Sequence, residues 1–66
     1  MSNFHRIVSA AQNNGYEISG ESCPNWVEIE FIGKCSIQGD DVIVHRPNGF
    51  EPEIWSVNEL IMFIEA

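Results

Sequence analysis

Apolar and acidic residues alternate along the segment from Trp26 to Phe31. A period of two places Val27, Ile29 and Phe31 on one side of an extended chain, with Glu28 and Glu30 on the other side. The pattern predicts a β-strand with one face in a core and one face in water.

Three turn signals divide the following segment into hairpins: Gly33, Gly39-Asp40 and Pro47-Asn48-Gly49. Four antiparallel strands are therefore expected between Trp26 and Trp55. A slip of one residue would turn the apolar side chains of a strand toward water, so the apolar pattern also selects the register. The preferred pairs are Phe31 with Cys35, Ile29 with Ile37, Ile37 with Val42, Cys35 with Val44 and Val42 with Ile54.

A helix is expected at each end of the chain. Ser2 is a suitable N-cap for the first helix, and Asn14-Gly15 is a suitable end. Its apolar positions, spaced for one helical face, are Phe4, Ile7, Val8 and Ala11. The second helix begins at a capping box formed by Ser56 and Glu59, next to an apolar run that can be buried.

These elements predict a single α+β domain, residues 1–66, with two layers. A four-stranded antiparallel sheet carries the N-terminal and C-terminal helices on one face, in the order α-β-β-β-β-α. Residues 16–18 are either a short strand or part of a loop, and residues 20–25 are expected to form a loop.

The predicted registers divide the strand residues between two faces. The inward set is Val27, Ile29, Phe31, Cys35, Ile37, Val42, Val44, Phe50 and Ile54. The outward set holds five carboxylates, namely Glu28, Glu30, Asp41, Glu51 and Glu53. Trp26, Ile32 and Ile43 are expected to add apolar surface among these acids.

The chain has ten acidic residues and three basic ones, which gives a formal charge of -7 over 66 residues. A face of one charge sign has a cost, because like charges on neighbouring strands repel each other. We therefore expect a partner-binding surface made of Glu28, Glu30, Asp41, Glu51, Glu53, Trp26 and Ile43. The competing interpretation is a surface that only keeps the protein soluble.

The same charge argues against direct binding to nucleic acid or to a membrane, because both recruit proteins through Lys and Arg clusters. Cys23 and Cys35 are expected to be free thiols, with Cys35 in the core. We expect no metal site, no cofactor and no enzymatic activity, since the sequence has no closely spaced ligand pair and no phosphate-binding motif.

In size, charge and compactness the whole chain resembles the small acidic anti-CRISPR proteins that bacteriophages direct against type I surveillance complexes. Glu28, Glu30, Asp41, Glu51 and Glu53 carry this resemblance. It implies a stoichiometric inhibitor that mimics DNA and occupies a basic nucleic-acid-binding site of such a complex. It further implies a bacterial host. The longest apolar run, residues 60–64, is too short to span a membrane and the N-terminus has no signal-peptide pattern, so we expect a cytoplasmic protein, and we expect it to be a monomer.

Two other functions fit the same composition. One is an antitoxin or immunity-type protein that masks a basic nuclease. The other is a structural protein whose acidic surface is only a solubility device.

Overall fold

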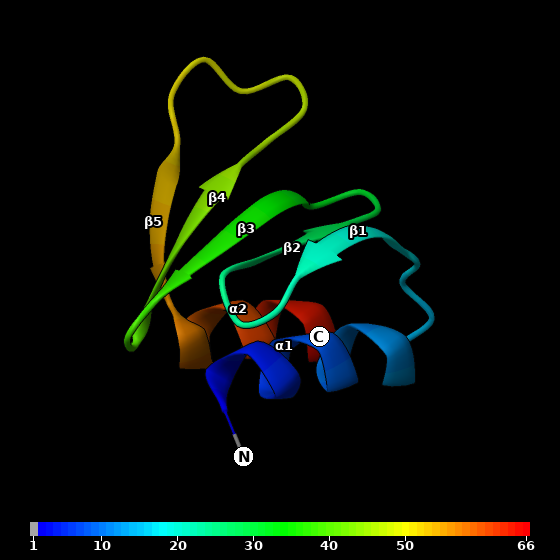
Figure 1. Ribbon diagram of the computed structural model, residues 1–66. Helices are drawn as coiled ribbons and strands as arrows, with labels where there is room; N and C mark the ends of the chain where they lie inside the picture. Colours follow the sequence, from blue (N-terminus) through cyan, green and yellow to red (C-terminus); the bar gives the residue numbers. More distant parts are fainter. Residues whose placement is uncertain (1) are drawn as a thin grey trace.

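The computed structural model describes residues 2–66 and shows a five-stranded antiparallel sheet with two helices on one of its faces (Figure 1). The strands lie side by side in sequence order. In chain order the elements are α1 (Asn3–Asn13), β1 (Ile18–Ser22), β2 (Trp26–Ile29), β3 (Gly33–Gln38), β4 (Asp41–His45), β5 (Glu53–Ser56) and α2 (Val57–Glu65). The predicted α+β class and the two terminal helices are confirmed, but the sheet has one strand more than expected.

The additional strand is β1, which lies in a region predicted to be mostly loop. It pairs with β2 through Glu21 opposite Val27 and Ser22 opposite Trp26, and a short turn at 23–25 joins the two strands. The prediction was wrong because β1 contains only one large apolar residue, Ile18, and so has no clear alternation. Pairing with a neighbouring strand outweighs this weak local preference.

Both predicted helix starts are confirmed. The Ser2 hydroxyl accepts the backbone N–H of His5 at 3.2 Å. At the start of α2 the Ser56 hydroxyl accepts the Glu59 N–H at 3.1 Å, and the Ser56 N–H donates to the Glu59 carboxylate at 3.0 Å. These bonds satisfy backbone donors that a helix leaves unpaired at its first turn.

The core lies between the helices and the inner face of the sheet. The two helices pack against each other, with α1 also contacting β1 and β2 and α2 contacting β4 and β5. The largest fully buried side chains are Ile7, Ile29, Ile32, Leu60, Ile64, Val27, Val42, Val44 and Cys35. The predicted inward residues of β2, β3 and β4 are confirmed as core, with Ile37 only partly buried but packed against it. Ile32, by contrast, was expected on the outer face.

The register between β3 and β4 is confirmed, with Ile37 opposite Val42 and Cys35 opposite Val44. The register between β2 and β3 differs from the prediction, because Ile29 pairs with Gly33. The connecting turn is therefore 30–32, and not the three-residue loop 32–34 that the predicted pair of Phe31 with Cys35 implies.

This earlier turn reverses the expected burial of two apolar neighbours. Phe31 is 81% exposed, whereas Ile32 is 1% exposed and belongs to the core. Strand β2 ends at Ile29, where the chain leaves the extended conformation. The strand's alternation therefore does not decide whether Phe31 or Ile32 is buried.

The register between β4 and β5 differs by one residue, since Val42 pairs with Trp55 and Ile43 with Ile54. Trp55 therefore lies on the inner face and packs against the core, and Ile54 lies on the outer face, 76% exposed. Phe50, also expected in the core, is fully exposed in the loop that precedes β5. The inward-facing indole of Trp55 gains an edge-to-face contact with Phe63 of α2, with ring centroids 5.4 Å apart.

Candidate binding surface

The five carboxylates predicted to share the outer face are distributed over the molecule. Glu28 and Asp41 lie on the outer face, in β2 and β4, while Glu30 lies in the turn after β2 and Glu51 in the loop before β5. Glu53 lies on the inner face, because it pairs with the buried Val44. The expected flat array of five charges is therefore a wrong prediction, although whether each residue binds a partner stays open to test.

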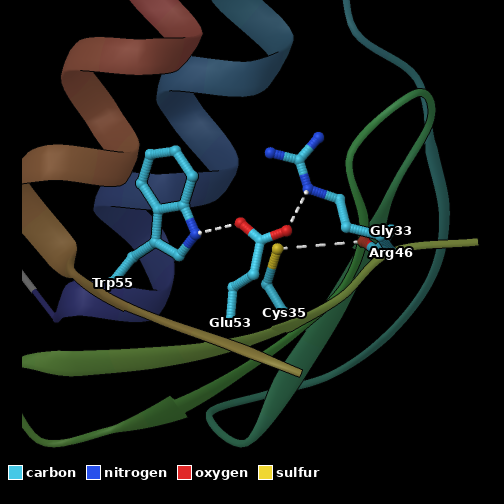
Figure 2. A network of polar contacts seen from close by, with 5 residues as sticks. All are labelled: Gly33, Cys35, Arg46, Glu53 and Trp55. Atoms are coloured by element: carbon cyan, nitrogen blue, oxygen red, sulfur yellow. Dashed lines mark hydrogen bonds and ion pairs between the residues drawn. The ribbon is translucent and has the colours of Figure 1, made fainter. Parts of the chain in front are cut away.

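Glu53 is held by contacts within the protein, as Figure 2 shows. One carboxylate oxygen lies 3.5 Å from Nε of Arg46, and the other accepts the indole N–H of Trp55 at 3.0 Å. The Arg46 guanidinium carbon lies 5.6 Å from the ring centroid of Phe63 and 5.9 Å from that of Trp55. The register of β5 thus turns one predicted binding residue into part of a packed cluster beside α2.

The outer face also contains a cation, Lys34, which the predicted register had placed in the turn between two strands. The Lys34 ammonium lies 4.4 Å from the ring centroid of Trp26, which is a cation–π contact, and Lys34 pairs with Glu28 across the strands. The opposite charges of Lys34 and Glu28 therefore lie side by side on this face.

Trp26 and Ile43 lie on the outer face, as predicted. They belong to a row that crosses four strands, in which each residue pairs with the next: Trp26, Ser36, Ile43 and Ile54. No helix covers this face of the sheet (Figure 1). The row offers apolar area beside the charges, and Lys34 contacts Trp26 within it.

A different group of acids lies at the β1 edge of the sheet, with Glu28 on the outer face and Glu21, which pairs with the buried Val27, on the side of the helices. Glu17, Glu21, Glu28 and Glu30 are all exposed, and the segment 17–30 contains no Lys, Arg or His. The Glu30 N–H donates to the Glu17 carbonyl at 2.9 Å, directly beyond the Ile18–Ile29 pair, so these two residues are cross-strand neighbours. We call residues 17–30 the acidic hairpin.

Two of the three cations contact groups outside this hairpin, whereas Lys34 contacts it through Trp26 and pairs across the strands with Glu28. Arg46 pairs with Glu53, and Lys34 stacks on Trp26. Arg6 donates to Asn58 at 2.7 Å and to Asn3 at 3.1 Å, which links the two helices. All ten carboxylates are exposed, and four of them belong to the acidic hairpin, against the single cation Lys34 that contacts it.

The two cysteines are free, as predicted. Cys23 is exposed in the turn between β1 and β2. Cys35 is buried on the inner face of β3, where its thiol donates to the Gly33 carbonyl at 3.8 Å (Figure 2). Burial raises the pKa of Cys35 to about 11, against a smaller opposing effect of Arg46.

The pKa of Glu59 is lowered, first by the backbone N–H of Ser56 and then by the Ser56 side chain. Within residues 2–66 there is no cluster of three or more potential metal ligands. No helix in this part of the chain is long and apolar enough to cross a membrane.

Sequence reasoning missed three residues that the fold makes prominent: Glu17, Glu21 and the exposed Phe31. Glu21 belongs to β1, a strand with too few apolar residues to be recognised, and Glu17 directly precedes that strand. A signal was nevertheless present, because no basic residue occurs between Arg6 and Lys34. Comparisons with protein-family models, curated proteins and solved structures find no match to this chain.

Proposed function

We propose that the protein is a binding protein without enzymatic activity, which inhibits a nucleic-acid-binding protein by occupying its basic site. The observation that carries this proposal is the acidic hairpin, with four exposed carboxylates and no cation among its residues. Such a surface attracts a groove lined by Lys and Arg, which is the surface that nucleic acid also requires.

The spacing of the hairpin suits this role. Neighbouring strands lie about 4.8 Å apart. Glu17 and Glu30 are joined by a backbone hydrogen bond directly beyond the paired ends of β1 and β2, and Glu28 is two residues earlier, so three charges lie within a short span. Duplex DNA has one negative charge per roughly 1.7 Å of helix axis. The hairpin is less densely charged than DNA, but the attraction has the same sign and acts over the same range.

The resemblance to anti-CRISPR proteins makes a type I surveillance complex the first target to test. Its target DNA enters a channel lined by basic residues, and an inhibitor bound there would exclude that DNA. In this proposal the protein acts in the bacterial cytoplasm as a monomer and forms a stoichiometric complex with one subunit of the surveillance complex.

The test is competition between the protein and a labelled target duplex for a purified type I surveillance complex. The wild-type protein should displace the duplex, and its inhibitory concentration should rise steeply with NaCl concentration, because salt screens charge attraction. The variant with Glu17→Gln, Glu28→Gln and Glu30→Gln should inhibit at least ten-fold more weakly.

A matched control removes three charges elsewhere, by Asp41→Asn, Glu51→Gln and Glu65→Gln. This control should retain most of the inhibition. Equal loss in both variants would show that net charge matters and the hairpin does not. Failure of the wild-type protein to displace the duplex would reject the proposed target and mechanism.

A further inference from the structure

Phe31 occupies a backbone position that disfavours a large side chain. It lies in the turn from β2 to β3, in which the Ile32 N–H donates to the Ile29 carbonyl at 3.1 Å. Its φ is 72°, and Glu30 is not among the residues with positive φ. Positive φ at the third residue alone is typical of a type II turn, in which Gly or Asn is the usual residue at that position.

The fold gains little from the ring that this backbone carries. Phe31 is 81% exposed, so most of its apolar surface remains in water. A bulky residue at positive φ is a genuine outlier, and such residues gather at functional sites. At Gly33 the packing of the fold explains the residue type. A Cβ there would lie 2.2 Å from the His45 carbonyl oxygen, so the position requires glycine.

The surroundings of Phe31 indicate what kind of surface could cover it. The residue follows directly after Glu30, the last residue of the acidic hairpin, and Glu17 is the cross-strand neighbour of Glu30. An exposed aromatic side chain beside exposed carboxylates matches an apolar pocket with Lys or Arg at its rim. Aromatic anchors with a polar surround are the arrangement that dominates the energy of many protein interfaces.

We infer that Phe31 is the anchor residue of the interface, and that its ring enters an apolar pocket next to the basic site of the partner protein. This inference rests on the proposed function and adds its source of selectivity. The acids attract any basic groove, whereas the ring selects a groove with a pocket of fitting shape beside it.

Phe50 provides a matched control, because it is fully exposed but has no positive φ and lies in the loop before β5. Phe31→Asn removes the ring and places at this position a residue that tolerates positive φ. Phe31→Tyr keeps an aromatic ring at this position, and its backbone still has to adopt positive φ. Phe50→Asn removes an exposed ring outside the hairpin.

The variants are compared in the competition assay with the purified type I surveillance complex, together with their thermal unfolding midpoints. Phe31→Asn should raise the inhibitory concentration at least ten-fold, leave its dependence on salt unchanged, and raise the unfolding midpoint. Phe31→Tyr and Phe50→Asn should inhibit within about two-fold of the wild type. A binding loss that accompanies a gain in stability cannot be explained by a damaged fold.

Inhibition by Phe31→Asn equal to that of the wild type would overturn the anchor role while leaving the proposed function intact. An equal loss in Phe50→Asn would also overturn it, since any exposed ring would then serve. If the wild-type protein fails to compete, the proposed function fails, and the inference falls with it.

Discussion

The Cys35 thiol makes stability depend on pH in the alkaline range. Its pKa of about 11 in the folded protein compares with an ordinary value of 9.0. Below pH 9 the thiol is neutral in both states, so its full contribution to stability is present. Between pH 9 and 11 the unfolded chain loses the proton more readily, and stability falls by about 1.4 kcal/mol per pH unit.

We therefore expect the free energy of unfolding to fall by about 2 kcal/mol between pH 8 and pH 10.5 through this group. Urea titrations at both pH values measure the change. Cys35→Ala is less stable at pH 8 but should lack this contribution, whereas Cys23→Ser should behave like the wild type. An equal alkaline loss in wild type and Cys35→Ala would assign the effect to other groups.

Single residues also show where the sequence is informative about burial. Val27 and Ile29 were predicted correctly because they lie within a regular strand, where alternation fixes the side. Phe31 and Ile32 are adjacent apolar residues at a turn, and their burial depends on where the chain reverses. The apolar pattern does not specify that point, and only the backbone of the turn decides it.

Among the elements, α2 depends on its capping box. Ser56→Ala removes the side-chain acceptor of the Glu59 N–H and should destabilise the protein by about 1 kcal/mol. For a domain of this size, that loss lowers the thermal midpoint by roughly 4–8 °C. Calorimetry is the measurement. Ser9→Ala, on the exposed side of α1, is the control and should not lower the midpoint. An unchanged midpoint in Ser56→Ala would contradict the importance of the cap.

The elements with strong local sequence signals were predicted. Strand β1, which depends on pairing with a neighbouring strand, was not. The two helices have cap residues and a helical apolar period, and the turn at 39–40 has a two-residue hairpin signal. Strand β1 has neither, because its place at the sheet edge depends on pairing with β2. The loop 46–52 contains two prolines, at 47 and 52, and its length determined the register of β5.

For the whole molecule, a formal charge of -7 implies net self-repulsion in the folded state. Salt screens this repulsion, so the urea midpoint should be higher in 0.5 M NaCl than in 0.02 M NaCl. The Glu17→Gln, Glu28→Gln and Glu30→Gln variant should be more stable than the wild type at low salt and should respond less to added salt. A wild-type midpoint that falls with salt would show that ion pairs outweigh the repulsion.

The candidate site could be predicted only in its charge. Composition gives the excess of acids. Their arrangement depends on the register of each strand, which decides which face of the sheet each side chain is on. The shift of one residue between β4 and β5 was enough to move Glu53 to the inner face beside Arg46. The acidic hairpin depends in turn on β1, the strand with the weakest sequence signal.

The registers also place the two tryptophans on opposite sides of the sheet. Trp26 lies on the open face beside Lys34, and Trp55 lies on the covered face against Phe63. The sheet thus has one tryptophan on each side. Fluorescence from Trp26 should therefore respond to binding at the uncovered face. Fluorescence from Trp55 should respond to the packing of α2 against the sheet.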